Sequence, residues 1–122
     1  MNEAQFKAFI VSMIRRQTMR WKPKSEVKRK ARVSRGMYEC AGCGKHGPAT
    51  LPPPKGKKRR INNALVDHIE PVIDPKVGFV DWNTYMDRMF VEEDGLQLLC
   101  HSCHTKKTQQ ERDIANARLR SV

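Results

Sequence analysis

The chain lacks any long hydrophobic run and has few aromatic residues. No stretch of 18 apolar residues occurs, so no segment is expected to span a bilayer. Near the N-terminus the longest apolar stretch covers only residues 8–11, too short for the hydrophobic core of a signal peptide. Aromatic residues make up 7% and hydrophobic residues 39% of the 122 residues, which predicts one compact domain with a modest core. A cross-link such as a bound metal would help to stabilise so small a core. We therefore expect a soluble, cytoplasmic protein with no membrane partner.

Acidic residues are scarce in the first half of the chain. Residues 1–60 contain 17 Lys and Arg against 3 Asp and Glu, a balance of +14, whereas residues 61–122 contain 7 against 10, a balance of −3. A basic half joined to a mildly acidic half predicts a polyanion-binding arm beside a site that uses carboxylates, and nucleic acid is the favoured polyanion. A solubilising arm, or a segment that contacts anionic lipid, would have the same composition.

The N-terminal part is predicted to be helical. Residues 2–21 have apolar side chains at a spacing of four, with Asn2 as the capping residue and Pro23 as the stop. The apolar face of this helix is expected to include Phe6, Phe9, Ile10, Met13, Ile14 and Trp21. A second, very basic helix over residues 25–35 would end at Gly36 and lie on the surface. We expect residues 1–36 to form a basic helical extension of a domain that covers residues 37–122.

The rest of the chain predicts a mixed α+β fold. Residues 47–60 form a proline-rich loop with a basic end, and residues 64–70 form a strand closed by a proline. Asp81 is expected to cap a short helix that ends near Gly95, followed by a strand at residues 96–99 and a last helix at residues 102–120. The short helix presents an apolar stripe that predicts core packing, at Trp82, Tyr85, Met86, Met89 and Phe90.

Four cysteines form two C-x-x-C pairs, which predict a structural zinc site. Cys40 and Cys43 make the first pair, and Cys100 and Cys103 make the second. Each short turn presents two sulfurs to one ion, and four thiolates satisfy tetrahedral zinc without leaving a position for substrate. Disulfides, or a redox-active pair, are the alternatives, and a reducing compartment disfavours the disulfides. His46 could replace one cysteine as a ligand, although a solvent-exposed loop histidine is the simpler interpretation.

Asp67, His68 and His104 form a candidate hydrolytic set. Phosphodiester hydrolysis needs an activated water and positive charge at the phosphate. A neutral histidine can accept the proton of water, and a divalent ion held by a carboxylate and an imidazole can bind the phosphate. Taken singly, Asp67 and His68 could be a satisfied pair on a strand, and His104 could cap the last helix.

These residues resemble the motif of the HNH endonuclease family. The similarity runs from about residue 37 to residue 110, through Cys40-x-x-Cys43, Asp67-His68-Ile69-x-Pro71 and Leu96-Gln97-Leu98-Leu99-Cys100-x-x-Cys103-His104-x-x-Lys107-Thr108. The whole chain is similar to small free-standing HNH enzymes of tailed phages, some of which are homing endonucleases. The resemblance implies a phage-infected bacterial cytoplasm as the location.

The resemblance also implies the fold and the chemistry. It predicts a ββα-metal core in which His68 is the general base and Asp67 and His104 bind Mg²⁺ or Mn²⁺. Products would carry a 5′-phosphate and a 3′-hydroxyl. Double-stranded DNA would be the partner, with no obligatory protein partner. Basic side chains expected to contact the DNA include Arg59, Arg60, Lys106 and Lys107, together with the basic segments at 22–35 and 55–60.

Two features depart from the family pattern or complicate it. The family usually has an asparagine that helps to orient the base histidine where this chain has Gly95, so a backbone carbonyl would have to do so, or activity would be weakened. Asn83 is a conceivable substitute, but its position predicts a solvent-facing side chain. Strand alternation also sends Asp67 and His68 to opposite faces unless the strand ends or bulges there. The alternative function is a non-catalytic zinc module that binds nucleic acid.

Overall fold

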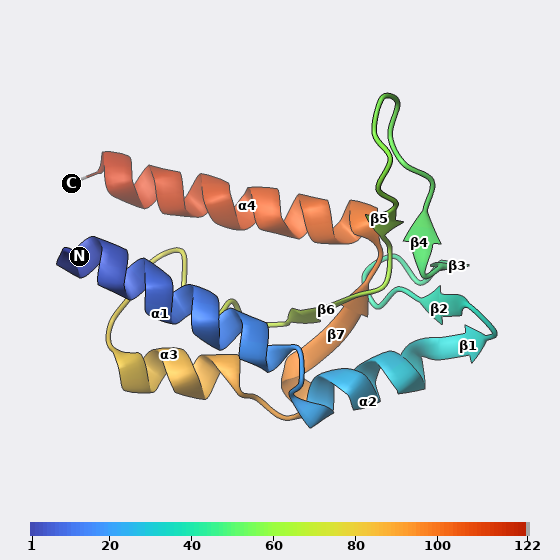
Figure 1. Ribbon diagram of the computed structural model, residues 1–122, viewed down its shortest axis with the longest axis horizontal. Helices are drawn as coiled ribbons and strands as arrows, with labels where there is room; N and C mark the ends of the chain where they lie inside the picture. Colours follow the sequence, from blue (N-terminus) through green and yellow to red (C-terminus); the bar gives the residue numbers. More distant parts are fainter. Residues whose placement is uncertain (122) are drawn as a thin grey trace.

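The computed structural model describes residues 1–121, which form four helices and seven short strands (Figure 1). The helices are α1 (Glu3–Thr18), α2 (Lys22–Ala31), α3 (Trp82–Met89) and α4 (His101–Arg120). The strands are β1 (Arg32–Ser34), β2 (Met37–Glu39), β3 (His46–Pro48), β4 (Thr50–Leu51), β5 (Ile61–Asn62), β6 (Leu65–His68) and β7 (Leu96–Leu99). A 3₁₀ turn at Glu93–Gly95 precedes β7. The fold is thus a small mixed α+β fold, as predicted. None of its described helices combines the length and the apolar character that crossing a membrane requires.

Three small antiparallel sheets organise the chain. One has the order β1-β2-β3, and the other two are the pairs β4-β5 and β6-β7. In the β6-β7 pair, Asp67 lies opposite Gln97 and His68 lies opposite Leu96, without a bulge. The chain turns from β7 straight into α4, so that β6, β7 and α4 form a ββα unit. The apolar core is small and is concentrated on this unit and α3, at Ala64, Tyr85, Met89, Leu96, Leu98 and Leu99.

Of the two N-terminal helices, α2 packs against this unit. α2 contacts β6, β7 and the 3₁₀ turn, and Lys30 forms a 2.8 Å ion pair with Glu93 of that turn. Between α1 and α2, the indole N–H of Trp21 donates a 2.7 Å hydrogen bond to the Val91 carbonyl, and its ring meets Phe90 edge to face. These contacts hold the end of α1 and the start of α2 close to the β6-β7 sheet.

Local capping signals predicted several boundaries well. The Asn2 and Gln5 side chains form a capping box at the start of α1, and the Asp81 carboxylate accepts a hydrogen bond from the Thr84 N–H at the start of α3. Strand β7 has the predicted bounds, and α4 begins one residue before the predicted helix. Asn83 is exposed, as expected.

Other boundaries differ from the prediction. Pro23 does not stop a helix but lies in the first turn of α2, where its missing N–H costs nothing. α2 ends at Ala31 rather than Arg35, because the next residues form β1, and α3 ends at Met89 rather than near Gly95. The proline-rich loop also contains β4 and the end of β3, which is the edge strand of its sheet and so tolerates proline.

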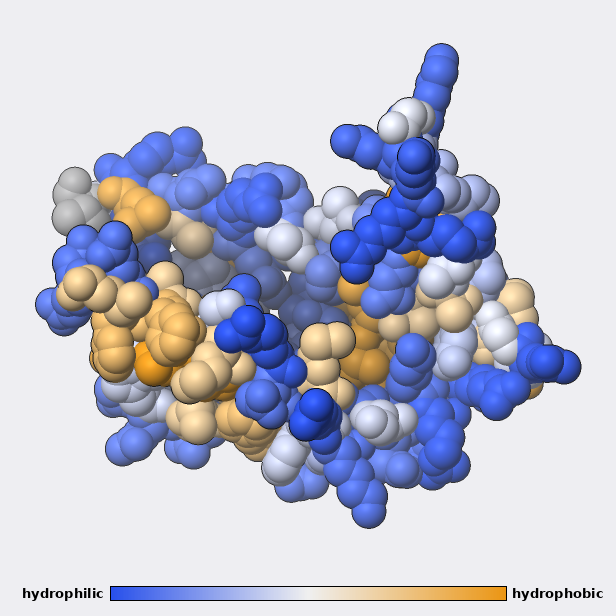
Figure 2. Space-filling view, in the orientation of Figure 1, coloured by the Kyte–Doolittle hydropathy of each residue, from blue (hydrophilic) through white to orange (hydrophobic). Residues whose placement is uncertain are grey.

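Two of the predicted apolar faces are only partly buried. On α1, Ile10 and Ile14 are half-buried, whereas Phe6, Phe9 and Met13 stay exposed. On α3, Tyr85 and Met89 are buried, but Met86 is exposed. Figure 2 shows apolar side chains gathered over α1 and toward α3, and a hydrophilic projection formed by the β4-β5 hairpin at the other end of the molecule.

Candidate functional site

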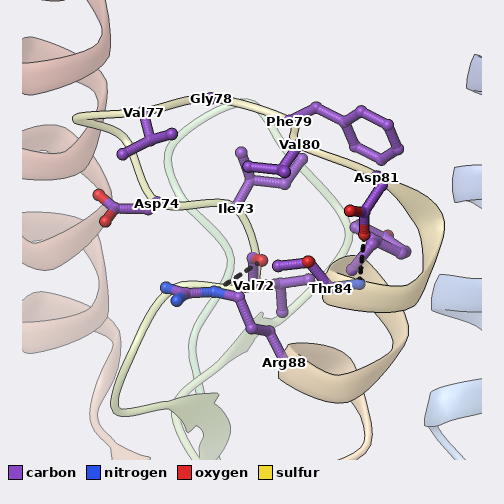
Figure 3. Close-up of a pocket in the computed structure, with 11 residues that line it drawn as sticks. Val72, Ile73, Asp74, Val77, Gly78, Phe79, Val80, Asp81, Thr84 and Arg88 are labelled. Carbon is purple, nitrogen blue, oxygen red and sulfur yellow. Dashed lines mark hydrogen bonds between the residues drawn. The ribbon is translucent and has the colours of Figure 1, made fainter.

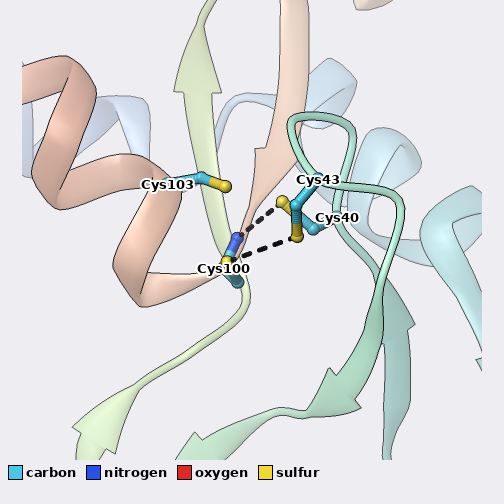
Figure 4. Close-up of side chains that lie close together, drawn as sticks. All are labelled: Cys40, Cys43, Cys100 and Cys103. Atoms are coloured by element: carbon cyan, nitrogen blue, oxygen red, sulfur yellow. Dashed lines mark hydrogen bonds between the residues drawn. The ribbon is translucent and has the colours of Figure 1, made fainter.

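The four cysteines come together at the junction of β7 and α4. Their sulfur atoms all lie within 4.8 Å of one another, close to the edge of about 3.8 Å that a tetrahedron with Zn–S bonds of about 2.3 Å would have. Figure 4 shows Cys40 and Cys43 on the turn after β2, facing Cys100 and Cys103 at the start of α4. All four are free thiols. The cluster could hold a structural zinc ion, as predicted.

Backbone N–H groups donate hydrogen bonds to one sulfur of this cluster. The N–H groups of Gly42 and Cys100 point at Cys40 Sγ from 3.3 and 3.2 Å. Burial raises the pKa of the Cys40 thiol, but the surrounding N–H groups outweigh burial and bring that pKa to about 6. Hydrogen bonds with neighbouring cysteines raise the pKa of Cys103 to about 12, so loading an ion would release its proton. His46 is exposed on β3 and lies outside the cluster.

A second site lies where β6, α4 and the N-terminal helices meet. A cavity of about 480 Å³ is lined by Asp67 and His68 of β6 and by His104 of α4. Arg15 and Lys24 add positive charge to its wall from the N-terminal helices. Figure 2 shows a hollow between α1 and α4 in the same region. The three residues predicted to form one hydrolytic set therefore do line one cavity.

Strand alternation is preserved at this cavity. Asp67 faces α4, where its Oδ1 lies 4.0 Å from His104 Nε2 and its Oδ2 lies 2.8 Å from Lys107 Nζ. His68 faces the end of α3, where its Nε2 lies 2.7 Å from the Met89 carbonyl oxygen. β6 ends at His68, and both residues line the same cavity although the strand pairing has no bulge there.

His68 is buried and held in one orientation. A carbonyl oxygen can only accept, so the bond to Met89 places the ring proton on Nε2 and leaves the lone pair on Nδ1. Burial lowers the pKa of His68 more than the Met89 carbonyl raises it, and Lys24 lowers it further. The imidazole is therefore neutral near pH 7 and able to accept a proton.

Asp67 has the surroundings of a cation-binding carboxylate. Its Oδ2 is buried and has no hydrogen-bond donor, because the Lys107 ammonium approaches as an ion pair without hydrogen-bond geometry. The 4.0 Å between Asp67 Oδ1 and His104 Nε2 lies within the roughly 4.2 Å that two bonds of about 2.1 Å to one ion can span. Within residues 1–121, the four cysteines are the only group of three or more potential ligands that lie close enough together to hold one ion. Asp67 and His104 could supply two ligands to one ion, an arrangement that suits an ion that keeps several waters.

Gly95 leaves little space for a side chain at this position. A Cβ built at Gly95 would lie 2.9 Å from Val91 Cβ and Cγ2, a distance at which Val91 must shift. The Gly95 carbonyl instead accepts a 3.0 Å hydrogen bond from the Ile69 N–H, which extends the β6-β7 pairing past His68. A backbone carbonyl, that of Met89, contacts the histidine ring in this chain.

The predicted DNA-contacting residues are in two environments. Arg59 and Arg60 lie on the exposed β4-β5 hairpin, where Arg60 donates to the Thr50 hydroxyl over 2.8 Å. Lys106 is exposed on α4, whereas Lys107 is half-buried and paired with acidic residues. No sequence pattern predicts the Met89 contact, because it uses a backbone carbonyl that every residue possesses. The sequence marked Lys24 only as one member of a basic segment.

A second, smaller cavity carries no comparable chemistry. It measures about 130 Å³ and lies between α3 and the loop before it (Figure 3). Most of its lining is apolar, and Arg88 closes one side by donating hydrogen bonds to the Pro71 and Val72 carbonyls. These hydrogen bonds of Arg88 fix the loop that leads from β6 to α3.

The chain was also compared with known proteins. Comparison with models of protein families, with curated proteins and with solved structures found no match. The functional conclusions below therefore rest on the side-chain arrangement and on the motif in the sequence.

Proposed function

We propose that this protein is a metal-dependent DNA endonuclease of the HNH type. The observation that carries the proposal is that Asp67, His68 and His104 line one cavity at the junction of an antiparallel strand pair and a helix. The order of the elements β6, β7 and α4 is the order that the HNH resemblance implies. The four-cysteine cluster at the same junction would hold zinc and brace the start of α4.

In the proposed reaction, His68 is the general base. Its Nε2–H is engaged by Met89, so Nδ1 would take the proton of the attacking water. Asp67 and His104 would bind Mg²⁺ or Mn²⁺, which supplies positive charge to the scissile phosphate and to the leaving oxygen. Lys24 and Arg15, on the wall of the same cavity, are placed to contact a phosphate of the bound strand. The expected products carry a 5′-phosphate and a 3′-hydroxyl.

The alternative is a non-catalytic zinc module that binds nucleic acid. The cysteine cluster and the basic β4-β5 hairpin would serve that function equally well. It does not account for a buried histidine, held by the Met89 carbonyl, that lines the same cavity as a carboxylate-and-histidine pair. We therefore favour the nuclease.

Cleavage of supercoiled plasmid tests the proposal. Zinc-loaded protein is incubated with plasmid and Mg²⁺ or Mn²⁺, and His68→Ala is expected to lose cleavage by about 10²–10⁴-fold because the general base is gone. His46→Ala is the matched control, since this exposed histidine lies outside the cavity. Zinc content and thermal unfolding are measured for both variants.

The possible outcomes are distinct. Cleavage that is equal in wild type and His68→Ala would remove His68 from the mechanism. DNA binding without cleavage under any divalent ion would favour the non-catalytic module instead.

A further inference from the structure

Lys107 occupies a central position beside the proposed ion site. It lies on α4, one turn after His104, and its side chain is 23% exposed. Its ammonium is 2.8 Å from three oxygens: Asp67 Oδ2, the His68 carbonyl and Glu111 Oε1. A solvated lysine that gripped DNA would not be enclosed in this way.

The ammonium balances the charge of Asp67. Within residues 1–121, the only basic side chains in ion-pair contact with Asp67 are Lys107 at 2.8 Å and His104 at 4.0 Å. Asp67 is 18% exposed, and its Oδ2 is buried, so an unpaired charge there would be costly. Lys107 thus stabilises the carboxylate when no other cation is present.

We propose that Lys107 is an internal cation that a divalent ion must displace from Asp67, and that Glu111 retains the displaced ammonium. The inference rests on the proposed function, because it concerns the same carboxylate. An ion held by Asp67 Oδ1 and His104 Nε2 would lie beside the Lys107 ammonium on Oδ2 of the same carboxylate, and the two positive charges would repel each other. Glu111 is four residues further along the same helix and already contacts the ammonium, so the exchange requires no new partner for Lys107.

The exchange keeps Asp67 paired with a cation in both states. It also makes ion binding weaker than Asp67 and His104 alone would allow, because the ion pair with Lys107 must first be broken. Lys107 would therefore set the concentration of divalent ion at which the site fills.

Binding of Mn²⁺ to zinc-loaded, DNA-free protein tests this inference. Free Mn²⁺ is followed by electron paramagnetic resonance, and Lys107→Met, which keeps the aliphatic stem, is expected to bind about tenfold more tightly than wild type. Lys107→Arg keeps a cation and should bind like wild type. Lys106→Met is the matched control, since Lys106 is exposed and its substitution removes the same charge. Mn²⁺ prefers oxygen ligands and will not displace zinc from four thiolates.

Two further variants locate the effect. Asp67→Asn in the Lys107→Met background should abolish the tighter binding. Glu111→Gln should weaken Mn²⁺ binding in wild type but have no effect in the Lys107→Met background, if Glu111 acts only by holding the ammonium. This second comparison includes Glu111→Gln alone, so it gives a result even if Lys107→Met proves unstable.

Unchanged or weaker Mn²⁺ binding by Lys107→Met would overturn the inference. The proposed function would still stand after that result if the wild type cleaves plasmid and His68→Ala does not. If neither the wild type nor any variant binds Mn²⁺ through Asp67, and the wild type cleaves no plasmid, both proposals fail.

Discussion

At the scale of single residues, the contact between His68 and Met89 depends on a tight turn at Gly95. The Met89 carbonyl belongs to the last residue of α3, and the segment between α3 and β7 folds back so that Val91 lies against Gly95. The Val91 carbonyl also accepts the hydrogen bond from Trp21 that fixes the start of α2. A change at Gly95 is therefore expected to disturb both the orientation of the histidine and the packing of α2.

Gly95→Ala should lower stability by about 1–3 kcal/mol, because its Cβ would force Val91 to move in a packed region. Urea unfolding followed by tryptophan fluorescence measures the change. Ser102→Ala, an exposed substitution on α4, is the control and should stay within about 0.5 kcal/mol of wild type. Equal stability of Gly95→Ala and wild type would show that Val91 relaxes freely and that the glycine is not required.

At the scale of elements, the β4-β5 hairpin is built to present cations. The Lys57 N–H donates a 2.9 Å hydrogen bond to the Pro54 carbonyl, and Gly56 between them has a φ of +81°, a conformation that favours glycine. Arg60 ties the base of the hairpin to Thr50 through hydrogen bonds to its hydroxyl and carbonyl oxygens. The exposed residues Lys55, Lys57, Lys58 and Arg59 lie in the loop of this hairpin, which projects away from the body of the molecule (Figure 1).

Replacing Lys57, Lys58 and Arg59 together by Gln should weaken DNA binding and reduce its salt dependence. Each lost phosphate contact lowers the slope of log K against log salt by about 0.9, so a decrease of about 2.7 is expected. Fluorescence anisotropy with a labelled duplex at several salt concentrations measures both quantities.

The matched control replaces Lys76, Arg112 and Arg120 by Gln, which removes the same net charge from other exposed positions. Arg112 and Arg120 lie on the part of α4 remote from the hairpin. An equal loss of slope in both triple variants would mean that net charge alone, rather than the hairpin, governs binding.

The elements also show what the sequence could and could not predict. The caps at Asn2 and Asp81 were predicted because each is encoded within three residues of chain. Pro23 was misinterpreted, since proline both ends helices and fits their first turn, and the choice depends on tertiary packing. The motif selects Asp67, His68 and His104 as candidate residues, but it does not predict their mutual geometry. That geometry depends on Met89, 21 residues from His68, and on the side-chain packing of Lys107.

At the scale of the whole molecule, the cysteine cluster joins segments that are far apart in the sequence. Cys40 and Cys100 are 60 residues apart, and the Ala41 N–H donates a 2.8 Å hydrogen bond to the Leu98 carbonyl beside the cluster. The three sheets are short, and no single sheet spans the molecule. The cluster therefore connects the β1-β2-β3 sheet to the ββα unit that carries Asp67, His68 and His104.

Removal of zinc should consequently unfold the protein, whereas removal of Mg²⁺ or Mn²⁺ should leave the fold intact and stop only the cleavage that the proposed function predicts. Zinc contributes about 10–16 kcal/mol in zinc-finger peptides, which equals or exceeds the net stability of about 5–15 kcal/mol of a typical domain. Circular dichroism and the fluorescence of Trp21 and Trp82 follow the transition, and added zinc should restore the native signal. Cys43→Ser should resemble the zinc-free protein, and Ser102→Ala, between the second pair of cysteines, should not. Native fluorescence that persists after complete loss of zinc would show that the small core alone holds the fold. The cysteine cluster would then stabilise only its own surroundings and would not be needed to support the candidate site.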